Sequence, residues 1–497
     1  MCRPTKEEFR ADCKEGRLIP IFREIPADLE TPVSAFLKLR GKGIGFLLES
    51  VERGEQLGRY SILGIDPSPI LWRENGITEI REGGAGRTAE EPDPLRTLES
   101  LMAAYRTVSL PGLPPFFGGV VGYISYEVAH CFERLPGKIK HDLNLPEAIF
   151  LLADKLVIFD HVTQKLMVMV NARGSSSPDN TYDQAVQRIS QIVESLGKPL
   201  RNGRTGRGRT QGSLRSSSEE RTFRSNFTPR SFSQAVGSAK EYIAKGDAYQ
   251  IVFSQRLKGI TSADPFTIYR ALRMLNPSPY MFFLDFSNFQ LIGSSPEMLV
   301  KTTGDLAETR PIAGTRKRGR TEAEDLWLEK ELIADPKERA EHVMLLDLGR
   351  NDLGRVCKFG SVQAPALMEV ERYSHVMHMV SRAQGLLREG CSPYDLLRAA
   401  FPAGTVTGAP KIRAMEIVEE LEKTERGPYA GAVVTFGLNG SLNSCITIRT
   451  IVMKGRTVYL QAGAGIVADS DPTREYEETV NKIQALKRAI LTAEEGW

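Results

Sequence analysis

The chain has 497 residues, of which 41% are hydrophobic and 26% are charged, proportions that are typical of globular proteins. This composition excludes a chain that is disordered throughout, and the length leaves room for two or more domains. Lysine and arginine number 65 and aspartate and glutamate 62, so the formal net charge is only +3. We therefore expect no nucleic-acid partner, and no apolar run approaches the roughly 20 residues that span a bilayer.

The N-terminal residues MCRPTKEEFRADCKEGR are charged and lack the apolar core of a secretory signal. The six cysteines form neither a CxxC spacing nor a Cys/His cluster of the zinc type. Reduced cysteines in a cytoplasmic protein are therefore the expectation.

One break in composition divides the sequence. Residues 197–230 are rich in arginine, glycine and serine and have almost no large apolar side chains, which is typical of a flexible linker or a long surface loop. This break predicts an N-terminal domain over residues 1–196 and a C-terminal domain over residues 231–497. Contact with RNA through the arginine-rich segment is the weaker alternative, because no aromatic platform for base stacking accompanies it.

Both parts mix strand-like and helical patterns. In the N-terminal part, apolar runs predict strands over Phe150–Phe159 and Lys165–Asn171, and an amphipathic pattern predicts a helix over Tyr182–Leu196.

In the C-terminal part, predicted strands over Gly431–Phe436 and Ser444–Met453 flank Asn439-Gly440, which is a strong hairpin signal. A third strand is predicted over Thr457–Ala462. Consecutive strands joined by tight turns favour antiparallel pairing, and the sequence contains neither a P-loop nor a GxGxxG motif after a strand.

Two predicted helices carry carboxylates on one face. They begin at Asp335-Pro336 and Asp471-Pro472, where an aspartate can cap the helix and proline fits the first turn. The residues that share these faces are Glu338 and Glu341 on the first helix and Glu475, Glu478 and Lys482 on the second. They are either solvated surface charges, with Glu338 completing a capping box, or a sparse site for Mg²⁺, which needs only one or two carboxylates.

Three further features could bind an anion. Arg449 is predicted in the middle of an apolar strand, so it either points to solvent or binds an anionic ligand. The segment QAGAGI, residues 461–466, has small residues that allow backbone amides to approach a carboxylate, or that a tight strand exit requires. Tyr429 could donate to a ligand oxygen or cap the edge of a sheet.

Two more residue types could move protons. Glu297 follows a turn-like SSP sequence, as a carboxylate carried on a loop would. His378 is surrounded by apolar residues and is in that setting more often a core residue than a base. His375 is the alternative and is predicted to be more exposed. No Ser/His/Asp or Cys/His triad is evident from the spacing.

Many long segments resemble those of the chorismate-utilising enzymes, above all the branch that makes anthranilate. The matching segments include FLLES and PFFGGVVGYISYE before the linker and IGSSPEMLV, ETRPIAGTRKRG, DPKERAEHVMLLDLGRNDLGRV, FPAGTVTGAPKIRAMEIV and QAGAGIVADSDPTREYEETVNK after it. The resemblance implies an α+β fold, a large sandwich of two packed antiparallel sheets with helices outside. Nothing in the arginine-rich linker matches.

The resemblance also implies roles for the matching residues. The carboxylates implied to serve Mg²⁺ are Glu341 and Glu478 as ligands, with Glu338 and Glu475 supporting them. Glu297 is similar in position to the general acid beside the leaving 4-hydroxyl group of chorismate, and His378 to a second catalytic residue. The residues implied to bind chorismate are Gly314, Thr315, Tyr429, Arg449, Gly463, Ala464, Gly465 and Lys482.

The activity implied is conversion of chorismate and ammonia to anthranilate and pyruvate, the first committed step of tryptophan biosynthesis. Gln250 replaces the water-activating lysine of isochorismate and salicylate synthases, and Ala313 replaces the nucleophilic lysine of aminodeoxychorismate synthases. Aminodeoxychorismate synthase of the folate branch remains the alternative. No cysteine has the glycine-rich context of a glutaminase, so a separate glutamine amidotransferase subunit is implied as the partner that supplies ammonia.

Two segments on either side of the linker, FLLES and NPSPYMFF, resemble the family's feedback site for L-tryptophan. The residues implied to bind this inhibitor are Glu49, Ser50, Pro279, Tyr280 and Met281. The alternative is that Leu47-Leu48 belongs to a core strand and that the prolines only stiffen a turn.

Overall fold

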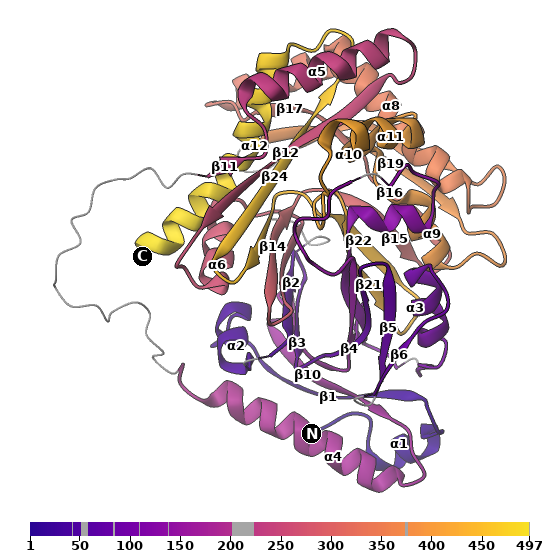
Figure 1. Ribbon diagram of the computed structural model, residues 1–497. Helices are drawn as coiled ribbons and strands as arrows, with labels where there is room; N and C mark the ends of the chain where they lie inside the picture. Colours follow the sequence, from indigo (N-terminus) through magenta and orange to yellow (C-terminus); the bar gives the residue numbers. More distant parts are fainter. Residues whose placement is uncertain are drawn as a thin grey trace.

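The computed structural model describes residues 1–41, 43–50, 58–82, 85–108, 110–137, 139–200, 223–372 and 376–496. Within these ranges, two large antiparallel sheets pack face to face and helices cover their outer surfaces (Figure 1). The α+β sandwich expected from the sequence is therefore confirmed. None of the helices in the described part of the chain is both long and apolar enough to cross a lipid bilayer.

The first sheet, sheet A, joins strands from both ends of the chain. In spatial order its strands are β1 (Leu18–Pro26), β10 (Lys165–Arg173), β9 (Lys155–Asp160), β3 (Tyr60–Ile65), β2 (Gly45–Glu49), β13 (Tyr280–Asp285), β14 (Phe289–Ser295), β23 (Thr450–Lys454), β24 (Thr457–Ile466), β12 (Gln250–Ile260) and β11 (Arg224–Ser225), with β20 (Gly408–Ala409) also paired to β12.

The second sheet, sheet B, is built in the same way. In spatial order its strands are β17 (Ile312–Lys317), β19 (Val376–Leu386), β16 (Leu306–Thr309), β15 (Met298–Thr303), β22 (Leu442–Ile446), β21 (Ala432–Gly437), β7 (Gly119–Ile124), β8 (Ala148–Ala153), β4 (Ser68–Glu74), β5 (Ile77–Glu82) and β6 (Ala85–Thr88), with β18 (Gln363–Arg372) also paired to β19.

Helices pack on the outer faces of both sheets. On sheet A lie α1 (Lys6–Asp12), α2 (Pro32–Leu39), α4 (Pro178–Gly197), α5 (Pro229–Ala244), α6 (Pro265–Leu275) and α12 (Pro472–Glu495). The other helices are α3 (Pro94–Met102), the 3-10 helix η1 (Tyr126–Cys131), α7 (Glu322–Ala334), α8 (Pro336–Gly354), α9 (Pro393–Ala400), α10 (Gly404–Thr407) and α11 (Lys411–Glu422). Helices α5 and α11 lie at the opposite end of the molecule from α1 and α4 (Figure 1).

Backbone hydrogen bonds join the two halves of the sequence within each sheet. In sheet A, β2 pairs with β13, and in sheet B, β7 pairs with β21. Residues 201–222 of the predicted linker lie outside the described residues, whereas β11 and the first residues of α5 fall at its C-terminal end. The domain boundaries at residues 196 and 231 stay a prediction.

The predicted strands are confirmed except at two places where the chain changes sheets. The run Phe150–Phe159 was expected as one strand, but β8 lies in sheet B and β9 in sheet A, with Asp154 between them. The run Ser444–Met453 is likewise divided into β22 and β23. Both interpretations are wrong for the same reason: a chain that crosses between two buried sheets remains apolar on both sides of the crossing, so no alternation marks the break.

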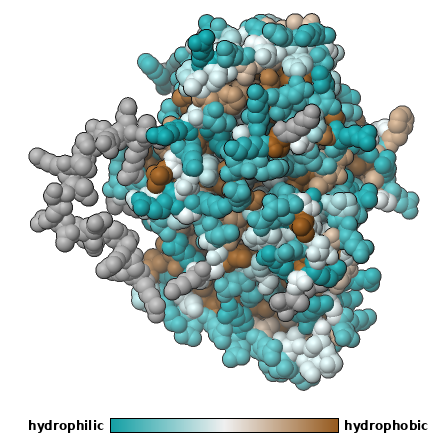
Figure 2. All heavy atoms as spheres, viewed as in Figure 1, coloured by the Kyte–Doolittle hydropathy of each residue, from teal (hydrophilic) through white to brown (hydrophobic). Residues whose placement is uncertain are grey.

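The layer between the sheets is packed with aromatic rings set against glycines. Phe282 lies opposite Gly293 on the neighbouring strand, and Phe46 lies opposite Gly64 in the same manner. A Cβ atom added to Gly293 would lie 2.0 Å from the Phe282 ring, closer than any real contact. Glycine is therefore required at this position to admit the ring. Outside the core, hydrophilic residues predominate on the face shown in Figure 2.

Replacing Gly293 with alanine should destabilise the protein, because Phe282 is fully buried and cannot move away from the added methyl group. We expect the free energy of unfolding to fall by about 1–3 kcal/mol, measured by urea denaturation. Gly237→Ala is the matched control: it lies within α5 with no atom within 4 Å of an added Cβ, so it should stabilise by roughly 0.5–1 kcal/mol. Equal effects of the two substitutions would contradict the packing described here.

Candidate active site

A cavity of about 680 Å³ lies among α8, α10, α12, the strands β12, β17 and β24, and the loops that precede β15 and β23. This volume is in the range of small-molecule sites. The predicted site residues that line it are Glu297, Gly314, Thr315, Glu338, Glu341, Tyr429, Arg449, Gly463, Gly465, Glu475, Glu478 and Lys482. Residues separated by up to 185 positions in the sequence therefore meet in one place.

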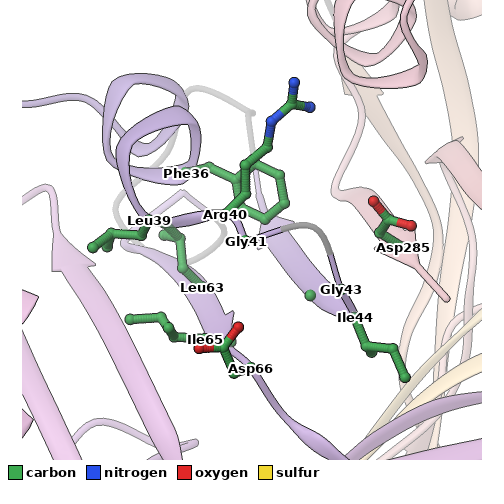
Figure 3. A pocket seen from close by; sticks show the side chains of 12 residues that line it. Phe36, Leu39, Arg40, Gly41, Gly43, Ile44, Leu63, Ile65, Asp66 and Asp285 are labelled. Atoms are coloured by element: carbon green, nitrogen blue, oxygen red, sulfur yellow. The ribbon is translucent and has the colours of Figure 1, made fainter. Parts of the chain in front are cut away.

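A second pocket in the structure is too small to bind a substrate. It lies beside α2, β2 and β3, with Phe36, Leu63 and Asp66 among the residues around it (Figure 3). Its volume is only about 10 Å³, room for about one water molecule. The substrate-sized cavity is therefore the better candidate.

Helix α8 presents its carboxylates to the cavity from a well-capped first turn. The side chain of Asp335 accepts hydrogen bonds from the amides of Lys337 and Glu338, at 2.9 and 3.2 Å. The Glu338 carboxylate accepts a 2.9 Å hydrogen bond from Nη1 of Arg316 on β17. It therefore binds a neighbouring strand and does not complete a capping box with Asp335. Arg316, which the sequence analysis did not single out, thus fixes one wall of the cavity.

Helix α12 approaches from the other side and is tied to sheet A. Lys482 Nζ forms an ion pair with Glu478 at 2.6 Å and donates to the carbonyl of Gly463 at 3.0 Å. The Lys482 carbonyl in turn accepts a 2.8 Å hydrogen bond from Arg449 Nη1. One helical residue therefore orients both a carboxylate and a guanidinium of the cavity.

The carboxylates of the two helices lie close enough to affect one another. Burial raises the pKa of Glu341, and repulsion from Glu338 and Glu478 raises it further, while Gln250 Nε2 donates to its Oε1 at 3.2 Å and opposes the shift. Burial and the charge of Glu478 also raise the pKa of Glu475. A cation placed among these oxygens would relieve the repulsion.

This carboxylate set fits Mg²⁺ in the sparse form that the sequence predicts. Among the described residues, no group of three or more His, Cys, Asp or Glu side chains is arranged to hold a metal ion by itself. Mg²⁺ binds through one or two carboxylates and completes its coordination with water and substrate oxygens. The hard oxygen donors of α8 and α12 suit that chemistry.

Glu297 lies in the short connection between β14 and β15 and is only 8% exposed. Burial raises its pKa to about 7, against the opposing effects of the Thr405 side chain and the charge of Lys482. A carboxyl group with such a pKa is partly protonated at neutral pH, which a general acid requires. Thr405, in the short helix α10, carried no signal in the sequence, because a threonine among small residues is common.

Arg449 is not in the middle of a strand, as the sequence predicted. It lies between β22 and β23, where the chain passes from sheet B to sheet A, and it adopts a left-handed conformation with φ of +52°. The crossing directs its side chain into the cavity instead of to solvent. Burial lowers the pKa of its guanidinium, so a bound carboxylate would stabilise its charge.

Two predicted residues lie just outside the cavity lining. Ala464 alternates with Gly463 and Gly465 on β24, and its side chain is buried in an apolar cluster with α5 and α11. His378 lies on β19 opposite Thr315, with its Nδ1 2.8 Å from the Thr315 hydroxyl, and burial lowers its pKa. The alternative, His375, lies outside the described residues.

The residues of the expected tryptophan site lie at the β2–β13 seam, away from the cavity. The Glu49 carboxylate is buried and accepts hydrogen bonds from the Tyr269 hydroxyl at 2.5 Å and Arg273 Nε at 3.0 Å. Met281 pairs with Glu49 across the seam. The hydroxyl of Ser50 is buried and has no hydrogen-bond partner among the described residues.

Pro279 and Tyr280 complete this set at the start of β13, and the Tyr280 hydroxyl lies 3.4 Å from Oδ1 of Asn443. The structure therefore brings all five residues to one region, with Glu49 already engaged by neighbouring side chains. Residues 51–57, which follow Ser50, lie outside the described residues.

Comparison with known proteins gives consistent results. A family model described as chorismate binding enzyme matches residues 50–488. Anthranilate synthase component 1 of Acetivibrio thermocellus is 47% identical over 99% of both chains, and that of Aquifex aeolicus is 46% identical over 99% of this chain and 98% of the relative.

Solved structures show the same likeness. Anthranilate synthase component I from Streptococcus pneumoniae has a TM-score of 0.76 and 34% identity, covering 93% of this chain and 98% of that one. The menaquinone-specific isochorismate synthase from Escherichia coli, at 19% identity and a TM-score of 0.69, shares the fold. The chain therefore belongs to the chorismate binding enzymes, in the group formed by anthranilate synthase component 1.

Proposed function

We propose that this chain converts chorismate and ammonia to anthranilate and pyruvate in the cavity between α8 and α12. The observation that carries the proposal is the meeting of three kinds of group in one cavity: a buried carboxyl of raised pKa at Glu297, a half-buried guanidinium at Arg449, and the carboxylates of two helices. A dicarboxylate substrate that must lose a hydroxyl group needs a cationic partner and an acid.

The first step requires a proton at the leaving group. As ammonia attacks C2 of chorismate, the 4-hydroxyl departs as water after it takes the proton of Glu297, giving an aminodeoxyisochorismate. In the second step the C2 proton is removed and the bond between the ring and the enolpyruvyl oxygen breaks, which produces the aromatic ring. The released enolpyruvate takes up one proton at its methylene carbon and becomes pyruvate, so the proton count of this step is unchanged. We assign to His378 a role in this second step, exerted through its contact with Thr315 on the cavity wall.

We assign substrate binding to a second group of residues that line the cavity, separate from those that move protons. Arg449 and the small residues Gly463 and Gly465 would hold one carboxylate of chorismate, and Tyr429 its enolpyruvyl group. Glu341 and Glu478 would hold Mg²⁺, with Glu338 and Glu475 supporting them, and the ion supplies positive charge to the second carboxylate when bound. Gly314, Thr315 and Lys482 complete the enclosure.

Two positions favour ammonia over other nucleophiles. Gln250 directs its amide to Glu341, and an amide cannot serve as the base that activates water. Ala313 is buried on β17 and cannot form a covalent intermediate, so the 4-amino product of aminodeoxychorismate synthase is disfavoured. Both residues therefore favour attack by ammonia at C2 of chorismate.

The ammonia would come from a separate glutamine amidotransferase subunit. A glutaminase needs a thiol of lowered pKa, whereas burial raises the pKa of Cys131 and Cys357 to about 11 and that of Cys445 to about 12. All six cysteines are free, as expected in the cytoplasm, where we place the enzyme. L-tryptophan would bind at the β2–β13 seam, where the Ser50 hydroxyl has no hydrogen-bond partner within the part of the chain that the structure describes.

The direct test is product identification. Purified chain given chorismate, Mg²⁺ and an ammonium salt should release anthranilate, detected by fluorescence and mass, together with an equal amount of pyruvate. Glutamine alone should not replace ammonia, and added tryptophan should inhibit. Accumulation of 4-amino-4-deoxychorismate, isochorismate or salicylate would overturn the assignment.

The role of Glu297 predicts a pH dependence. Because the acid must be protonated and its pKa is about 7, kcat/KM should fall tenfold per pH unit above that value. Glu297→Gln should lower kcat by about 10²–10⁴-fold and abolish this alkaline limb. Initial rates between pH 5.5 and 9 test both points, and a limb that persists in the variant would assign the titration to another group.

The metal site predicts a difference between adjacent glutamates. Glu478→Gln should weaken Mg²⁺ binding in calorimetry and lower activity by about 10²-fold, because it removes the charge that faces the cavity. Glu477→Gln is the matched control, since Glu477 is exposed on the same turn of α12 and does not line the cavity. Similar metal affinity in the two variants would argue against this site.

A further inference from the structure

A buried ion pair lies directly behind the cavity. Arg426 and Glu422 are 2% and 4% exposed, with Nη2 of the arginine 2.6 Å from Oε1 of the glutamate and Nε 2.8 Å from Oε2. Burying such a pair costs desolvation free energy, and apolar residues of the same volume often stabilise a protein as well or better. Stability alone therefore does not account for it.

The remaining donors of Arg426 reach the backs of two cavity walls. Nη1 donates to the carbonyl of Val406 and Nη2 to the carbonyl of Val252, both at 2.7 Å. The guanidinium also lies 5.8 Å from the centre of the Tyr429 ring. Val252, Val406 and Tyr429 all line the cavity, on β12, on α10 and before β21.

Glu422 reaches a fourth wall residue through Ser254. Its Oε1 accepts hydrogen bonds from the amide and the hydroxyl of Ser254, both at 2.8 Å. The Ser254 oxygen accepts a 2.9 Å hydrogen bond from Nε2 of Gln461, which lines the cavity on β24. We call Val252, Val406, Tyr429 and Gln461 the cavity floor.

We propose that Arg426 and Glu422 are positioning residues, which fix the cavity floor in the arrangement that binds the ring and enolpyruvyl group of the substrate. The proposal rests on the function assigned above, because it takes chorismate as the ligand of the cavity. A planar guanidinium bonded to three separate chain segments sets their relative positions more narrowly than apolar packing would. The carboxylates of α8 and α12 do not contact the ion pair, so we expect substitutions in the pair to leave Mg²⁺ binding unchanged.

The proposal predicts a selective change in Arg426→Lys. A lysine keeps the charge but cannot contact Glu422, Val406 and Val252 together, so kcat/KM for chorismate should fall by about 10²-fold, mostly through KM. The KM for ammonia and the activating concentration of Mg²⁺ should stay near those of the wild type. Arg413→Lys is the matched control, because Arg413 lies on α11, the helix that carries Glu422, and its half-buried ion pairs with Asp247 and Glu416 do not involve the cavity floor.

A second variant keeps the test decisive if Arg426→Lys does not fold. Ser254→Ala leaves the ion pair and the hydrogen bond from the Ser254 amide to Glu422 in place, and it removes the hydroxyl that connects Glu422 to Gln461. It should lower kcat/KM for chorismate about tenfold, with circular dichroism and thermal midpoint near those of the wild type. An unchanged KM for chorismate in the folded variants would overturn the proposal. Wild-type enzyme that makes no anthranilate would instead refute the function itself, so the two failures are distinguishable.

Discussion

Repulsion among the carboxylates that α8 and α12 direct into one half-buried cavity is the constraint on which the site depends. Burial makes it costly for Glu341 to lose its proton, and the charges of Glu338 and Glu478 add to that cost. Folding tolerates the arrangement because Arg316, Lys482 and the amide of Gln250 each contact one of these carboxylates. The negative charge that these contacts do not neutralise makes the cavity receptive to a divalent cation.

Holding like charges together requires rigid supports, and the fold provides them. Aspartate caps fix the first turns of both helices, and the backbone of α12 is bonded to Arg449 at the crossing between the sheets. On the opposite side, the pair of Arg426 and Glu422 joins β12, α10 and the segment that carries Tyr429. Polar contacts thus fix the cavity from the side of α12 and from the floor, which suits a reaction that depends on orientation.

The sequence predicted those parts of the site that follow a local rule. Glu341 and Glu478 were identifiable because helix caps and three-residue spacing place them on one face of each helix. The sequence wrongly predicted Arg449 inside a strand, because no local pattern of residues marks the point where a chain passes from one buried sheet to the other. The Arg426–Glu422 pair was missed because an i,i+4 pair at the end of a helix reads as a surface contact, and its burial depends on segments more than 150 residues away. The resemblance, and not the spacing, supplied the chemical roles.

The central claim is that substrate and metal meet between the two helix faces. The most direct measurement is anomalous diffraction from a crystal of the chain in which Mn²⁺ replaces Mg²⁺, in the presence of chorismate or a stable dicarboxylate analogue. The account predicts a single strong peak between the carboxylates of Glu341 and Glu478, with a ligand carboxylate beside it and another at Arg449. A peak elsewhere, or an analogue bound outside this cavity, would contradict it.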